Sequence, residues 1–285
     1  MLAKLDAAAD LKQALLRSRN DDGGWGYYAG KASRLEPTCW ALLALGSAVD
    51  DAVLKNWPLK DGLLIDPKSP TPNFGFHALA LLTLFARRID HVTTNSQLVT
   101  AIANARGVKL ADRGAVRQRN DLQAWSWMEG TFSWAEPTAW CLIALKKARS
   151  LSLAVKTARI ADGDLVLFDR CCERGGWNYG NSNILGKQLP PYVSTTAVGL
   201  LALQDQRQHE AVRKSLQLLQ QEWATEASGL ALGLAAIALR RFGVSNEGVI
   251  ASLQTSTATI LALGNNHVVS VALFALEPEH NAFAY

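Results

Sequence analysis

Two glutamates recur at an interval of one hundred residues, and each begins the same short motif. Glu36 begins "EPTCWALLAL" and Glu136 begins "EPTAWCLIAL". Two such carboxylates could act as a catalytic pair on one substrate. Each glutamate also precedes a proline at an expected helix start, where a carboxylate offsets the helix dipole and proline fits the first turn. The motif therefore predicts either a catalytic pair, Glu136 and Glu36, or two helix starts without chemistry.

Aromatic and polar residues recur near the same expected helix starts. Two tryptophans follow the glutamates at identical offsets, and histidines or hydroxyls stand near the start of other apolar runs. An apolar, aromatic-lined bowl with a few polar groups is typical of a ligand pocket. Core packing of the tryptophans and hydrogen-bonded core histidines are the structural alternatives. The residues expected to contact a substrate are Trp40, Trp140, Phe76, His77, Tyr192, Thr195 and His267.

The four cysteines do not form a metal-binding pattern. Cys39 and Cys141 lie inside apolar runs, where a free thiol behaves as a small hydrophobe. Cys171 and Cys172 are adjacent and can scarcely pair with each other without strain. Reduced thiols are the default in a cytosolic protein. We expect no metal and no cofactor.

The glutamate motifs belong to a unit that occurs six times. Apolar runs rich in alanine and leucine occupy residues 36–45, 75–84, 136–145, 194–203, 230–239 and 267–276. Because each is apolar nearly all round, each predicts a fully buried helix. Segments with polar and apolar residues at helical spacing lie between them, at 3–19, 95–106, 151–163, 206–223 and 246–261. Strand signals are almost absent.

This alternation predicts an all-α fold, an α/α toroid of about six outer and inner helix pairs in a single domain over residues 1–285. The buried helices would form an inner ring running in one direction, and the amphipathic helices would return outside it. An open stack would need polar terminal units, whereas the last run, "HVVSVALFAL", is as apolar as the middle ones. Parallel inner helices would bring Glu36, Glu136 and His267 to one opening.

The glycine- and tryptophan-containing turns and the apolar runs together resemble the repeats shared by squalene-hopene cyclases and the beta subunits of protein prenyltransferases. The resemblance covers nearly the whole chain and is carried by "NDDGGWGYY", "EPTAWCLIAL" and "RGGWNYGNSNILGKQLPPYVSTTAVGLLAL". The chain is most similar to standalone bacterial repeat proteins of this terpenoid cyclase and prenyltransferase superfamily. The resemblance implies a toroid with an aromatic-lined central cavity for an apolar substrate.

Two catalytic patterns of that superfamily are incomplete here. Glu136 falls on the position of the cyclase acid, but Trp134 and Pro137 replace its two flanking aspartates. Protonation of an alkene needs a strong acid, which a cluster of carboxyl groups helps to supply. The zinc ligands of prenyltransferases, an Asp-x-Cys and a histidine at inner-helix starts, have no counterpart here, so we expect no zinc.

The composition of the chain bears on whether it binds nucleic acid or spans a membrane. The net charge of +4 comes from scattered basic residues, which gives little support for nucleic-acid binding. The N-terminus carries charges where a signal peptide needs an apolar core, and the longest apolar run, 229–239, is too short to span a bilayer. We expect a cytoplasmic protein that binds no nucleic acid and has no transmembrane segment; peripheral membrane contact stays open.

Three functions remain open from the sequence. The first is an enzyme or binder for an isoprenoid or another elongated apolar molecule in the central cavity. The second is a non-catalytic toroid that binds a protein or lipid partner. The third is carbohydrate chemistry by Glu36 and Glu136, since α/α toroids also include glycosidases with two carboxylates at the inner-helix opening.

Overall fold

The six apolar runs form the inner helices of a ring. The computed structural model describes residues 6–66, 68–69, 71–89, 92–111, 118–277 and 281–285. Each inner helix is buried along most of its length, as expected for a segment without a polar face. The inner helices are α2 (Leu35–Leu45), α4 (Phe74–Ala86), α6 (Ala135–Ser150), α8 (Val193–Ala202), α10 (Gly229–Phe242) and α13 (Asn266–Leu276).

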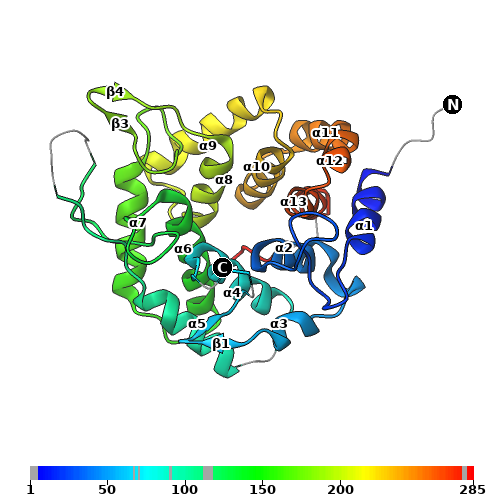
Figure 1. Ribbon diagram of the computed structural model, residues 1–285. Coiled ribbons are helices and arrows are strands. Elements are labelled where there is room, and N and C mark those ends of the chain that lie inside the picture. Colours follow the sequence, from blue (N-terminus) through cyan, green and yellow to red (C-terminus); the bar gives the residue numbers. More distant parts are fainter. Residues whose placement is uncertain (1–5, 67, 70, 90–91, 112–117, 278–280) are drawn as a thin grey trace.

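The ring is closed, and its helices are parallel. Each inner helix packs against the next one in the chain, and α13 packs against α2 (Figure 1). The starts of α2 and α13 meet through Glu36 and His267. At the other end, Lys146 near the end of α6 donates a hydrogen bond to the Ala202 carbonyl that ends α8. The predicted α/α toroid is therefore confirmed.

Amphipathic helices surround the ring, with some differences from the predicted segments. Residues 3–5 of the first predicted segment lie outside the described residues. The predicted segment 151–163 is wrong at its start, because α6 extends to Ser150 and a turn with Ser152 at a φ of +63° follows it. The outer helices are α1 (Ala7–Arg17), α3 (Ala52–Asn56), α5 (Val92–Asn104), α7 (Thr157–Arg170), α9 (Glu210–Glu222), α11 (Glu247–Thr255) and α12 (Thr257–Leu263).

Two short hairpins lie in the longer loops. Strand β1 (Leu59–Lys60) pairs antiparallel with β2 (Leu63–Leu64), and β3 (Asn183–Ile184) pairs with β4 (Lys187–Gln188). Both turns end in glycine at positive φ, which suits a two-residue hairpin. The β3–β4 hairpin lies within the loop that leads from Trp177 to α8, which is longer than the corresponding loops before α2 and α6.

A tryptophan–threonine contact attaches three of the loops to the ring. The Thr38 hydroxyl accepts a hydrogen bond from the Trp25 amide at 2.9 Å and donates one to the Trp25 carbonyl at 3.1 Å. Thr138 with Trp125 and Thr196 with Trp177 repeat the arrangement. The threonines thus bind the preceding loop, and not only the first turn of their own helix.

The three indole rings complete this contact on the outer side. All are fully buried, and each indole N–H donates to a carbonyl near the end of the preceding outer helix: Leu15, Ile102 and Leu167. Carbonyls in the last turn of a helix lack intrahelical partners. Each indole therefore provides a hydrogen-bond donor to the end of an outer helix.

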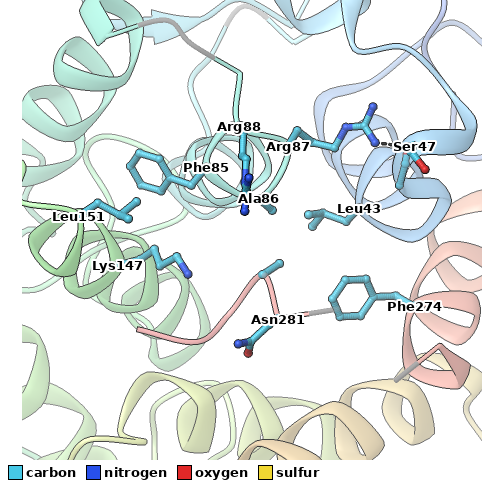
Figure 2. Close-up of a pocket in the computed structure, with 12 residues that line it drawn as sticks. Leu43, Ser47, Phe85, Ala86, Arg87, Arg88, Lys147, Leu151, Phe274 and Asn281 are labelled. Atoms are coloured by element: carbon cyan, nitrogen blue, oxygen red, sulfur yellow. Dashed lines mark hydrogen bonds between the residues drawn. The ribbon is translucent and has the colours of Figure 1, made fainter. Parts of the chain in front are cut away.

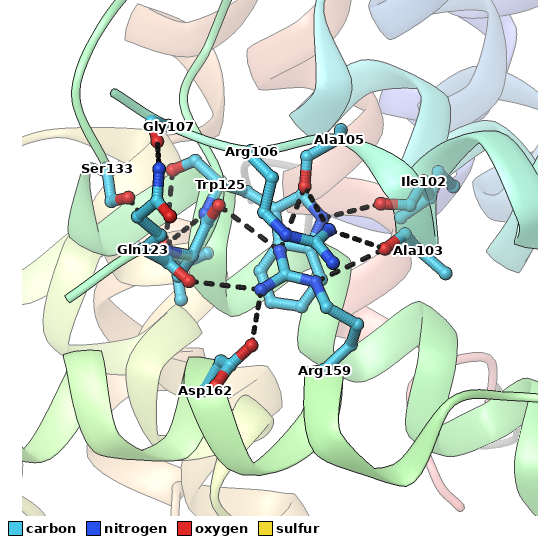
Figure 3. Close-up of polar contacts among 12 residues, drawn as sticks. Ile102, Ala103, Ala105, Arg106, Gly107, Gln123, Trp125, Ser133, Arg159 and Asp162 are labelled. Carbon is cyan, nitrogen blue, oxygen red and sulfur yellow. Dashed lines mark hydrogen bonds and ion pairs between the residues drawn. The ribbon is translucent and has the colours of Figure 1, made fainter. Parts of the chain in front are cut away.

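Arg159 fixes the second of these loops from the side (Figure 3). Its guanidinium lies 4.2 Å from the centre of the Trp125 ring and donates to the carbonyls of Ala103, Ala105, Gln123 and Ala124. Asp162 balances its charge at 2.8 Å. This buried arginine therefore joins the end of α5, the following loop and α7.

Removal of one threonine hydroxyl tests the attachment of the loops. Thr138→Val keeps the shape of the side chain but leaves the buried Trp125 amide without its side-chain acceptor, so we expect the free energy of unfolding to fall by about 1–3 kcal/mol. Thr83→Val is the matched control, because Thr83 is equally buried in α4 and its hydroxyl donates to the Leu79 carbonyl of its own helix, not to a loop. Urea unfolding of both variants measures the difference, and equal losses would contradict the structural role of Thr138.

Candidate functional site

The starts of α2, α6 and α13 bring two carboxyl groups and a histidine to one opening of the ring. Glu36 accepts a hydrogen bond from the Tyr27 hydroxyl at 2.6 Å. His267 Nδ1 lies 3.6 Å from the same carboxyl oxygen, Oε2. Tyr27 comes from the loop that Trp25 and Thr38 attach to the ring. The opening, called the acidic mouth below, is thus built by inner helices and by the loops that precede them.

Glu136 has a strongly shifted pKa at the acidic mouth. Burial, and next the negative charge of Glu36, raise the pKa of Glu136 to about 7, while a hydrogen bond from Trp140 lowers it in part. The two carboxyl groups therefore interact although α4 lies between their helices. Glu136 can hold a proton near neutral pH and release it to a bound molecule.

Tyr27 supports the opposite role for Glu36. The phenol donates its proton to Glu36, and burial together with the Glu36 charge raises the pKa of Tyr27 far above its ordinary value. The acidic mouth thus pairs a carboxyl with a raised pKa and a carboxylate held by a donor.

Aromatic rings fill the centre of the toroid below the acidic mouth. Trp40 and Trp140 are 1% and 6% exposed, and their rings meet edge to face with centroids 5.9 Å apart. Phe283 reaches between them from the C-terminal segment, with centroids 5.4 Å from Trp40 and 5.6 Å from Trp140. Phe274 of α13 also contacts Trp40 and Phe283. The open aromatic bowl expected at this position is therefore filled by side chains.

Figure 1 shows the chain end that supplies this filling inside the ring of helices. Lys147 donates to the Ala284 carbonyl at 2.6 Å, and Gln204 donates to the Phe283 carbonyl at 2.9 Å. The Tyr285 hydroxyl donates to the Ala202 carbonyl at 2.7 Å. Side chains of α6 and residues at the end of α8 thus hold the segment in place.

The other residues expected to bind a substrate have different surroundings. His77 is buried, and both ring nitrogens lie within 2.8 Å of backbone carbonyls, those of Asn73 and Leu64, so neither is open to a ligand. Burial lowers the pKa of His77. The buried Thr195 hydroxyl lacks a hydrogen-bond partner among the described residues. Phe76 contacts Trp127 at a centroid distance of 5.9 Å.

An aromatic row borders the acidic mouth on the side of α6 and α8. Tyr192, the residue before α8, contacts Tyr179 with centroids 5.0 Å apart, and Tyr179 contacts Trp134 at 6.4 Å. Phe132 stacks on Trp134 at 4.4 Å. Both tyrosines are exposed. Of this row, only Tyr192 was predicted from the sequence to contact a substrate. The contacts among the four rings depend on how two distant loops meet.

A cavity of about 500 Å³ adjoins the Glu36 side of the acidic mouth. Tyr27, Arg34 and Asn265 are among its lining residues, together with Lys31 and Lys68. Sequence reasoning missed Tyr27, although it lies two residues after Trp25 in a quoted motif. Its role depends on loop geometry, which the glycine-rich turn does not reveal.

Within the described residues, no three His, Cys, Asp or Glu side chains gather as a metal-binding group. The cysteines are free thiols, and burial raises the pKa of each. None of the described helices is long and apolar enough to cross a bilayer.

The whole described fold is similar to those of two glycoside hydrolases. A mutant of a reducing-end-xylose releasing exo-oligoxylanase superposes with a TM-score of 0.54 at 13% identity, covering 99% of this chain and 94% of that chain. The glycoside hydrolase family 76 mannosidase from Bacteroides thetaiotaomicron VPI-5482 gives a TM-score of 0.59 at 11% identity, covering 95% and 96%. No protein-family model and no curated protein matches the sequence. These similarities identify the α/α toroid fold.

Proposed function

We propose that this toroid hydrolyses a glycosidic bond at the acidic mouth. The observation that carries the proposal is the pairing of Glu136, whose pKa is raised to about 7, with Glu36, which accepts the Tyr27 hydrogen bond. Two carboxyl groups in surroundings that separate their protonation states are what glycoside hydrolysis needs.

Each carboxyl group has one task in the reaction. The Glu136 carboxyl gives its proton to the glycosidic oxygen as the bond from the anomeric carbon to that oxygen breaks. The Glu36 carboxylate takes a proton from a water molecule, whose oxygen forms the new bond to the anomeric carbon. We assign inversion of the anomeric centre because α4 separates the helices of the two residues, and inverting enzymes hold their carboxyl groups far enough apart to admit that water.

The aromatic row gives the substrate a place to bind. Exposed faces of Tyr179 and Tyr192 offer apolar surface with polar hydroxyl groups beside it. The two glycoside hydrolases of similar fold are described as a xylose-releasing oligoxylanase and a mannosidase. Short neutral oligosaccharides of xylose and mannose are therefore the first substrates to test.

The filled centre of the toroid argues against an isoprenoid site there and favours a non-catalytic toroid as the second candidate. An isoprenoid in the interior, the first expectation from the sequence, needs the space that Trp40, Trp140 and Phe283 occupy. The same filling favours a non-catalytic toroid that binds a partner as the second candidate. That candidate requires no proton transfer, so replacement of Glu136 by glutamine would leave its role intact.

Substitution of the two glutamates tests the proposed hydrolysis. Glu136→Gln removes the acid and Glu36→Gln removes the base, so each should lower kcat by about 10²–10⁴-fold. Wild-type activity should fall as the pH rises through about 7, where Glu136 loses its proton. Chromatography of products from xylo- and manno-oligosaccharides measures the rate, and proton NMR of the first product identifies the anomer.

Glu129→Gln is the control, because Glu129 is an exposed acid in the loop before α6. It should retain wild-type activity. The proposal fails if the wild type neither cleaves nor binds these oligosaccharides, or if Glu136→Gln cleaves them at the wild-type rate.

The protonation of Glu136 can be tested without a substrate. Because its pKa is higher in the folded than in the unfolded chain, its contribution to stability is complete below pH 4.5 and is lost as the pH rises toward 7. Glutamine cannot ionise, so Glu136→Gln should gain about 1–3 kcal/mol of unfolding free energy relative to the wild type between pH 4.5 and 8. Urea unfolding at several pH values measures this difference, and a constant difference would show that the pKa of Glu136 is not raised.

A further inference from the structure

A cavity of about 790 Å³ lies at the opposite end of the ring. The ends of α2, α4 and α6 form its walls, and Phe274 and the C-terminal segment close one side (Figure 2). We call it the basic cavity. Its lining residues are Leu43, Gly46, Ser47, Phe85, Ala86, Arg87, Arg88, Lys147, Leu151, Phe274, Asn281 and Ala282.

Three cationic side chains line the basic cavity, and none of its described lining residues is acidic. Arg87 stabilises the wall of the cavity, because its two terminal nitrogens donate to the carbonyls of Gly46 and Val49. Arg88 and Lys147 extend toward the enclosed space in Figure 2. Lys147 donates one described hydrogen bond, to Ala284, so an ammonium with three N–H groups keeps donors for a ligand.

A further positive charge, that of Arg241, acts on the basic cavity. Burial and the charge of Arg241 lower the pKa of Lys147. The Nε atoms of Arg87 and Arg241 are buried without an acceptor among the described residues. Carbonyls at helix ends attract cations, but here several cations gather around one space, and that arrangement favours an anion.

The backbone at Arg88 has a conformation that favours glycine. Arg88 follows α4 with a φ of +50°, the left-handed conformation in which helices usually place glycine. The chain uses glycine there after α10 and α12, at Gly243 and Gly264. Glycine would be less strained at position 88 but would remove the guanidinium from the cavity.

Apolar side chains form the rest of the wall. Leu43, Phe85, Leu151 and Phe274 lie around the space into which the two cations extend (Figure 2). A cavity of this volume exceeds what a single inorganic ion needs and falls in the range of small-molecule sites. The lining therefore fits a molecule with an anionic group and an apolar body.

We propose that the basic cavity binds an organic phosphate with an apolar body, its phosphate between Arg88 and Lys147. A guanidinium matches phosphate oxygens through paired N–H donors, and an ammonium adds a point charge. The apolar body lies against Phe85, Leu151 and Leu43. This site is separate from the acidic mouth, because the aromatic centre of the toroid lies between them.

Calorimetry of the full chain with decyl phosphate below its micelle-forming concentration tests the proposal. Decyl phosphate should bind, and decanol and inorganic phosphate should each bind at least about tenfold more weakly. Arg88→Gly removes one charge and places glycine at a positive φ, so the variant should fold like the wild type, and its thermal unfolding checks this. Arg88→Gly and Lys147→Met should each weaken binding of decyl phosphate about tenfold or more.

Arg174→Gly is the control, since Arg174 is an exposed arginine in a loop remote from the basic cavity. It should bind like the wild type. Sedimentation with vesicles containing phosphatidate distinguishes a lipid headgroup from a soluble phosphate. Binding to either form that Arg88→Gly abolishes supports the proposal. The proposal is overturned if the chain binds neither decyl phosphate nor the phosphatidate vesicles, or if it binds decanol as tightly as decyl phosphate. It is also overturned if Arg88→Gly and Lys147→Met leave binding unchanged.

Discussion

The contact between a buried tryptophan and a threonine hydroxyl is the interaction on which the acidic mouth depends. It occurs before α2, α6 and α8, with the indole N–H bonded to the preceding outer helix in each case. One residue thus joins an outer helix, a loop and an inner helix. Because Trp25 is fixed, Tyr27 two residues later reaches Glu36, and because Trp125 is fixed, its loop delivers Trp134 to the start of α6.

The parallel ring gives its two ends opposite electrostatic character. Helix starts favour anions and helix ends favour cations, each by about 0.3–1 kcal/mol near the surface. Glu36 and Glu136 at one end and Arg88 and Lys147 at the other follow this rule. The pKa of Glu136 nevertheless rises from 4.5 to about 7, a change equivalent to about 3 kcal/mol. Burial and the second carboxylate therefore outweigh the helix dipole at this position.

The ring could be predicted from the sequence because its signal is repeated and local. Six apolar runs, with amphipathic segments between them, specify six buried helices, and the apolar last run indicates closure. The filled centre could not be predicted, since Phe283 follows the last helix in a segment without periodicity and its contacts exist only once the ring has closed. Whether Glu36 and Glu136 interact could not be predicted for the same reason. Their helices are separated by α4, so the interaction depends on the curvature of the ring. The contacts of Thr38 and Thr138 could not be predicted either, because their partners lie thirteen residues earlier, in the preceding loop.

The filled centre also determines how the two ends can communicate. Phe274 lines the basic cavity and contacts Phe283, Phe283 contacts Trp40, and Trp40 stacks on His267 beside Glu36. This is an unbroken series of ring contacts from one opening to the other. Contact alone does not couple two sites, since coupling requires an element with two arrangements that both sites influence. The aromatic layer fills the centre of the ring between the two openings, so it separates the acidic mouth from the basic cavity.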